Sequence, residues 1–127
     1  MKFISLCDKQ SIKNDLDNDF KSADKYGKVR LSASCLYISK LFSNYFISFS
    51  DIAYCFRRVM IIPAKKRQLQ VENVVIVDKD MKELAVVQLP GRKITQDFFN
   101  DFKAKDTAIS FCCPDELKSK YSDAADA

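Results

Sequence analysis

Hydrophobic and polar residues alternate with a period of two along most of the chain, which is typical of β-strands. The clearest example is the stretch 45–62, YFISFSDIAYCFRRVMII. It is rich in aromatic and β-branched residues, which favour a pleated surface. It is broken once, at Ser50-Asp51, by side chains that favour turns. The pattern therefore predicts a strand, a tight bend and a longer strand that ends at Pro63.

Shorter stretches with the same period flank this one. They predict strands at 29–32 and 35–39 before it, and at 69–77 and 82–89 after it. The connections are too short for the crossovers that parallel strands need, so we expect sequential antiparallel neighbours. A further short strand is predicted at 108–112, followed by a helical turn.

Two segments have the period of a helix instead. In the first, Ile12, Leu16 and Phe20 are spaced by four residues and form a narrow apolar stripe. We therefore expect residues 1–27 to be an N-terminal helical segment packed on the domain. The domain itself is expected at 28–121, and residues 122–127 are expected to be a disordered tail.

The second helical segment carries a wider apolar stripe. Ile94, Phe98 and Phe102 share one face, and Phe99 widens it. Thr95 is predicted to be the N-cap, because a hydroxyl can accept a hydrogen bond from a free backbone N–H of the first turn. Three phenylalanines on one face must be covered, so we expect this helix to close one open side of the sheet.

Composition places the chain among ordinary single domains. It has 127 residues, of which 47% are hydrophobic and 30% charged, and a net charge of +4. This mild charge weighs against a nucleic-acid partner. The odd number of cysteines, five, predicts a reducing, cytoplasmic setting. The apolar runs fall far short of the roughly 20 residues of a membrane span, so no integral membrane segment is expected.

Several residue arrangements that support catalysis are missing. The chain contains no histidine, which excludes Ser-His-Asp triads, Cys-His pairs and mixed Cys-His zinc sites. Its two glycines cannot form a phosphate-binding loop. Its cysteines lack the pair spacing of zinc sites. The sequence therefore predicts a protein that is not an enzyme and that holds no cofactor and no metal.

Basic residues are concentrated after the bend, within residues 57–67. They are Arg57, Arg58, Lys65, Lys66 and Arg67. If the strands on either side pair as a hairpin, all five are expected to cluster at one end and to form an anion site for a lipid headgroup or phosphate. Arg57 and Arg58 point to opposite faces of a regular strand, however, so they cannot form one binding fork unless a bulge or twist re-aims one of them. The alternative is a solvated hairpin tip.

Two motifs resemble a bacterial family of small proteins with a pleckstrin-homology-like fold and no established function. One is Phe49 to Val59, FSDIAYCFRRV, of the form aromatic-x-Asp-Ile-x-Tyr-x-x-Arg-Arg-Val; the other is Asp115 to Tyr121, DELKSKY. The resemblance covers residues 28–121. It implies an α+β protein in which a bent, partly open antiparallel β-barrel of about seven strands is capped by a C-terminal helix. The chain departs from the family at Ser110 to Cys113, where the family usually has proline and glycine.

The resemblance also bears on lipid binding. Phosphoinositide-binding pleckstrin-homology domains generally place basic residues around the loop after the first strand, and here that loop, Ser32 to Ser34, is uncharged. We therefore predict a noncatalytic binding or scaffolding module. Its partner is expected to be another protein or a second copy, recognised through an exposed sheet edge. The alternative is peripheral binding to anionic lipid or phosphate through the basic 57–67 segment.

Overall fold

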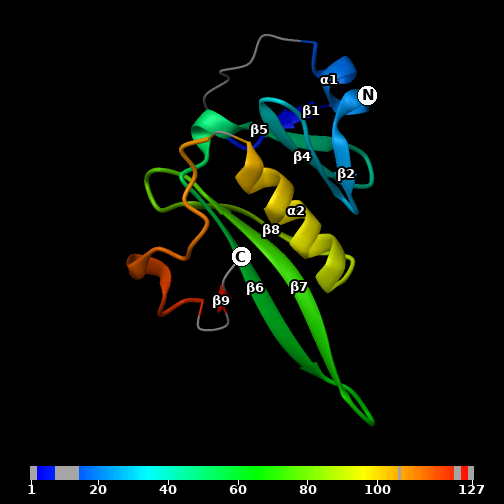
Figure 1. Ribbon diagram of the computed structural model, residues 1–127, viewed down its shortest axis with the longest axis vertical. Helices are drawn as coiled ribbons and strands as arrows, with labels where there is room; N and C mark the ends of the chain where they lie inside the picture. The colour runs from blue at the N-terminus through cyan, green and yellow to red at the C-terminus, as the bar shows by residue number, and fades with distance from the viewer. Residues whose placement is uncertain (1–2, 8–14, 106, 122–123, 126–127) are drawn as a thin grey trace.

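The computed structural model describes residues 3–7, 15–105, 107–121 and 124–125. These residues form an α+β protein with two β-sheets (Figure 1). The first sheet contains β1 (Phe3–Ser5), β2 (Asp24–Tyr26), β3 (Val29–Leu31), β4 (Cys35–Ser39) and β5 (Asn44–Ser48). The second contains β6 (Tyr54–Pro63), β7 (Gln68–Val77), β8 (Glu83–Leu89) and β9 (Ala124–Ala125). The helical elements are α1 (Leu16–Ser22), α2 (Arg92–Ala104) and the 3-10 turns η1 (Phe49–Asp51) and η2 (Asp115–Leu117).

The first sheet has the strand order β1-β5-β4-β3-β2. The strands predicted at 29–32 and 35–39 are confirmed as β3 and β4, and the pairs β3–β4 and β4–β5 are antiparallel as expected. β2, which was not predicted, also pairs antiparallel with β3. The expected pairing of sequential strands fails between β5 and β6, which lie in different sheets. β1, by contrast, pairs parallel with β5. Parallel strands need a long connection between them. The long segment of chain between β1 and β5 provides it.

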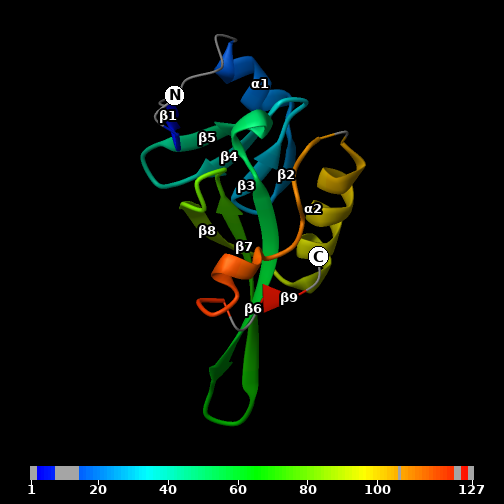
Figure 2. The ribbon, with the colours of Figure 1, turned by 90° about the vertical axis from the view of Figure 1, so that its left-hand side faces the viewer.

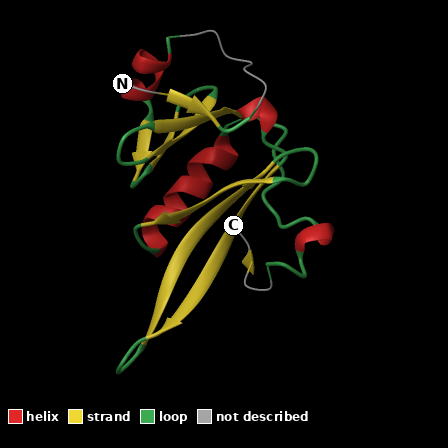
Figure 3. Ribbon diagram, turned by 180° about the vertical axis from the view of Figure 1, so that it is seen from behind, coloured by secondary structure: helices red, strands yellow, loops and turns green. Residues whose placement is uncertain are grey.

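The 45–62 stretch forms a strand, a bend and a longer strand that ends at Pro63, as predicted. The two strands belong to different sheets, because η1 turns the chain from β5 into β6 (Figure 3). The buried ring of Phe49 anchors this turn against Phe102 of α2, at a centroid distance of 4.9 Å. The described strands thus form separate sheets of five and four strands, and no closed barrel of about seven strands is present among them.

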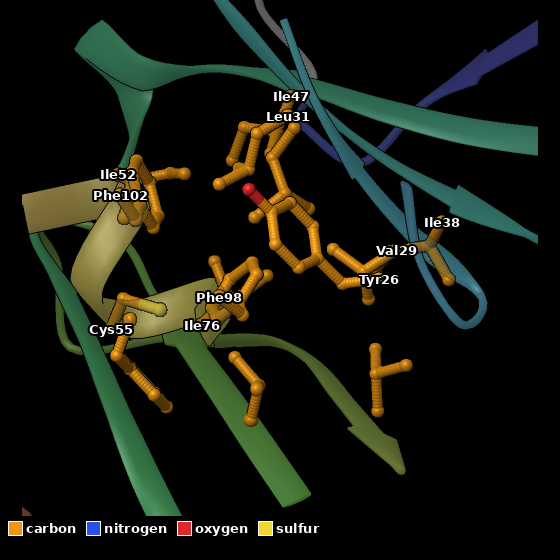
Figure 4. Close-up of a cluster of buried hydrophobic side chains, with 14 of the residues drawn as sticks. Tyr26, Val29, Leu31, Ile38, Ile47, Ile52, Cys55, Ile76, Phe98 and Phe102 are labelled. Carbon is orange, nitrogen blue, oxygen red and sulfur yellow. The ribbon is translucent and has the colours of Figure 1, made fainter. Parts of the chain in front are cut away.

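α2 lies between the two sheets, which confirms the prediction that it closes the open side (Figure 1). Phe98, Phe99 and Phe102 are all buried. Figure 4 shows Phe98 and Phe102 facing Tyr26 and Leu31 of the first sheet on one side and Ile76 of the second sheet on the other. The burial of these apolar surfaces is the main force that holds the two sheets together.

The predicted capping role of Thr95 is wrong. The N-cap is Gly91, which has a φ of 98°, and the helix begins at Arg92. Thr95 lies inside the first turn, where it is buried and its Oγ1 donates a hydrogen bond of 2.8 Å to the carbonyl oxygen of Gly91. Glycine takes this backbone conformation without strain, so the helix starts earlier than the pattern of side chains suggests.

The N-terminal segment is only partly helical. α1 begins after Asp15, whose side chain accepts from the backbone N–H of Asn18, and it packs through Leu16 and Phe20 on the first sheet. Ile12, predicted on the same stripe, lies outside the described residues. The segment also supplies β1 and β2 to the first sheet, which the expectation of a purely helical segment missed.

The C-terminal segment lies on the face of the second sheet that is opposite α2. The predicted strand at 108–112 is reduced to a single bridge between Ser110 and Tyr54, while η2 confirms the predicted helical turn. Tyr121 is buried against the ring of Phe56, at 5.3 Å. β9, within the segment predicted to be a disordered tail, pairs instead with β6; residues 122–123 and 126–127 are outside the described residues.

Candidate functional site: the hairpin arm

The candidate site is the distal part of the β6–β7 hairpin, residues 59–71, which we call the hairpin arm. β6 and β7 pair continuously from Tyr54 and Val77 to Pro63 and Gln68. Their described neighbours end earlier: β8 pairs with β7 only as far as Glu72, and β9 pairs with β6 only at positions 57 and 58. The arm therefore continues alone as a two-stranded ribbon, and it projects from the body in two perpendicular views (Figures 1 and 2).

The arm exposes large apolar side chains on both of its faces. Ile61 is 57% exposed, Ile62 43% and Leu69 42%. Residues paired across an antiparallel ladder share a face. The register therefore places Ile62 and Leu69 on one face, beside the pair Met60 and Val71, and places Ile61 on the other. On this second face Gln70 and Gln68 lie opposite Ile61 and Pro63, so the first face of the ribbon is apolar and the second is mixed.

A tight turn at the end of the arm carries three of the five predicted basic residues. The backbone N–H of Ala64 donates to the carbonyl oxygen of Arg67 at 2.9 Å, and this closes the turn. Lys65, Lys66 and Arg67 are all exposed. Within the described ranges, no ion pair joins any of these three residues to a carboxylate. The tip is therefore a concentrated positive charge at the end of an apolar ribbon.

Arg57 is not part of this tip. Its Nε and Nη2 atoms donate to Glu72 Oε2 and Oε1 at 2.7 and 2.5 Å, which is a bidentate ion pair across the two strands. The side chain of Glu72 is only 2% exposed and that of Arg57 21%. The hydrogen bonds to Glu72 raise the pKa of Arg57 above its ordinary value, although burial opposes this. The charge of Arg57 is thus satisfied internally, where the arm joins the body.

Arg58 lies on the opposite face, as predicted, and its guanidinium stacks 5.4 Å from the ring centroid of Tyr121. The expectation that all five basic residues cluster at one end of the hairpin is wrong. Arg57 lies six positions before Pro63, which corresponds to about 20 Å at the rise of an extended strand. The length of the ribbon separates the two arginines from Lys65, Lys66 and Arg67.

One feature of the sequence marks the arm, but its hydrophobic pattern does not show that the arm is exposed. Residues 59–62, VMII, form a continuous apolar run within β6. Such a run predicts a strand that is buried on both faces. In the structure its distal residues are exposed, because the strands that would cover them end before they reach the arm.

Two features of the described residues bear on metal binding and on thiol reactivity. No group of three or more histidine, cysteine, aspartate or glutamate residues that could hold a metal ion occurs among them. Cys55 is fully buried, and burial raises the pKa of its thiol, which keeps it protonated and unreactive. Within the same ranges, no helix has the length and apolar character that crossing a membrane requires.

We found no match of the chain to a protein-family model and no significant similarity to a curated protein or to a solved structure.

Proposed function

We propose that this protein is a noncatalytic binding module that docks a partner protein through the hairpin arm. The observation that carries this proposal is the exposure of Ile61, Ile62 and Leu69 on a ribbon that projects from a well-packed domain. Apolar surface gains about 25 cal/mol for each Å² that is removed from water. Contiguous exposed apolar surface on a folded domain is typical of an interaction site.

The side chains of the arm indicate what kind of partner surface binds it. Because apolar side chains occupy both faces of the ribbon, a groove that encloses it buries more apolar surface than a flat contact does. The three exposed cations at the tip favour a partner surface that presents carboxylates to the tip. The buried Arg57–Glu72 pair joins the two strands at the base of the arm, which reduces the ordering cost of binding.

We further propose that the domain has a pleckstrin-homology-like fold. Its support is the order of elements: antiparallel strands β2 to β5, then β6 to β8 in a second sheet, then α2 between the sheets. A cytoplasmic setting is proposed with it, because Cys35 and Cys55 are fully buried and serve as small apolar side chains.

A photo-crosslinking amino acid at position 61 should give at least tenfold more partner adduct in native lysate than the same amino acid at position 96. Ile61 and Gln96 are both exposed, but Gln96 lies on α2, away from the arm. The Ile61→Asp/Ile62→Asp double variant should suppress capture of the same partner by affinity-tagged protein, while its stability changes by only about 1 kcal/mol because both side chains are exposed. Equal adduct yields at positions 61 and 96 would contradict the proposal.

A second candidate function is peripheral binding to anionic lipid headgroups, favoured by the exposed positive charge of Lys65, Lys66 and Arg67. The location of these cations limits how the arm meets a bilayer. Insertion tip first would carry the charges into hydrocarbon, at a cost of several kcal/mol. Only headgroup contact therefore remains. This contact leaves the apolar faces of the ribbon largely uncovered, so a protein groove fits the arm better.

The lipid candidate predicts that Lys65→Ala/Lys66→Ala/Arg67→Ala weakens binding to phosphatidylserine-containing vesicles about 100-fold, at about 1 kcal/mol per basic residue. The measurement is co-sedimentation with phosphatidylcholine vesicles that contain or lack phosphatidylserine. The matched control removes the same charge elsewhere, by Lys79→Ala/Lys82→Ala/Arg92→Ala, at three exposed positions outside the arm. Unchanged binding of the tip variant would exclude this candidate.

A further inference from the structure

A second group of exposed hydrophobic side chains lies outside the hairpin arm. Leu41 and Phe42, in the turn between β4 and β5, are each 87% exposed, and Val86 of β8 is 39% exposed. Leu41 and Val86 line a groove with a volume of about 650 Å³ between this turn and β8. Ile38 and Val87 also line it, so apolar side chains come from both sheets. In Figure 2, β8 lies at the outer margin of the molecule, below the β4–β5 turn.

The groove follows an open edge of the second sheet. β8 is the terminal strand of that sheet, and its described partner is β7 alone. The hydrogen bond between Ala64 and Arg67 identifies which alternate residues of β6 and β7 direct their backbone groups toward each other. The pairing of β7 with β8 then identifies which residues of β8 direct their backbone groups toward β7. By the alternation of antiparallel strands, the backbone N–H and C=O groups of Val86 and Gln88 point away from β7. Within the described part of the chain, no strand pairs with these groups.

The charges of the residues that line the groove indicate which kind of segment binds there. Lys28 and Lys40 line it, and none of its lining residues is acidic. The tip of the hairpin arm is basic as well, so the arm of a second copy would bring like charges together here. A partner segment with carboxylates has the complementary charge.

We propose that the outer edge of β8 is a docking site for an extended, acidic segment of a partner protein. The segment adds as a strand to β8 and exchanges backbone hydrogen bonds with Val86 and Gln88. An apolar side chain of the segment occupies the space between Ile38, Leu41 and Val87, and its carboxylates lie beside Lys28 and Lys40. This site is separate from the hairpin arm. With both sites the domain binds two partners at once and acts as a scaffold.

The test uses a labelled synthetic peptide of alternating valine and aspartate, measured by fluorescence anisotropy and by amide chemical shifts of the whole protein. The amide signals of Val86 and Gln88 should shift on titration. N-methylation of one alternate set of peptide amides should weaken binding at least tenfold, and methylation of the other set should have less than a twofold effect, because only alternate N–H groups face β8. Equal effects of the two sets, or no shift at Val86 and Gln88 at millimolar peptide, would overturn the proposal.

Charge reversal in the groove provides a second measurement that does not depend on peptide methylation. Lys28→Glu/Lys40→Glu should weaken peptide binding at least tenfold, whereas Lys65→Glu/Lys66→Glu at the arm tip should change it less than twofold. If the groove variant and the tip variant weaken binding equally, the attraction is only a general effect of net charge and the proposed site is wrong. The groove variant should leave the photo-adduct at position 61 intact, so this site and the hairpin arm can fail independently.

Discussion

Replacing Phe98 by alanine should lower the free energy of unfolding by about 3–5 kcal/mol. The side chain is 0% exposed and lies where the two sheets and α2 meet. Its ring packs edge-on against Tyr26 at 5.5 Å, Phe99 at 5.1 Å and Phe102 at 5.6 Å. Truncation removes contacts to both sheets at once and leaves a cavity that three surrounding aromatic rings cannot easily fill.

Urea denaturation followed by far-UV circular dichroism measures this effect. Phe42→Ala is the matched control, because the same side chain is 87% exposed there and its loss should change stability by no more than about 0.5 kcal/mol. Phe98→Leu should recover more than half of the loss, since it refills most of the volume. A loss below about 1 kcal/mol for Phe98→Ala would show that α2 is not the centre of the core.

Replacing Glu72 by alanine is expected to cost about 3 kcal/mol of stability. Glu72 is almost fully buried, and it accepts both hydrogen bonds that hold the guanidinium of Arg57. Without it, a largely buried positive charge has no partner. The loss comes from this unsatisfied charge more than from the attraction of the pair itself, which largely offsets the desolvation of the two groups.

This explanation predicts a specific recovery. The double variant Arg57→Leu/Glu72→Leu should be within about 1 kcal/mol of the original protein or more stable, because it removes both charges and fills the space. Asp97→Ala is the control: its ion pair with Lys93 is exposed, and its loss should cost less than about 1 kcal/mol. If the double variant is as unstable as Glu72→Ala, an unpaired charge is not the cause.

The Arg57–Glu72 pair also connects stability with the proposed function. It joins β6 to β7 next to the point where β8 and β9 end and the arm begins. Loss of Glu72 should therefore loosen the base of the arm before it unfolds the domain. We expect the adduct yield at position 61 to fall in Glu72→Ala under conditions where circular dichroism still reports a folded protein.

Local periodicity by itself determined the parts of the fold that depend on neighbouring residues. The strand, bend and strand of residues 45–62 were predictable because alternation and turn-forming side chains act over a few positions. The covering role of α2 was predictable from three phenylalanines on one face. β1 and β2, each three residues long, carried too short a pattern to distinguish them from a polar helical segment.

Tertiary structure decided which residues the sheets leave uncovered, and therefore where the candidate sites lie. The apolar run of β6 predicts burial, but its exposure depends on where β8 and β9 end. The internal neutralisation of the Arg57 charge depends on Glu72, which the pairing of two strands brings across the ladder. The open edge of β8 likewise depends on what the rest of the chain places beside it. Sequence periodicity records which side chains share a face, whereas coverage depends on contacts between distant segments, which no local pattern records.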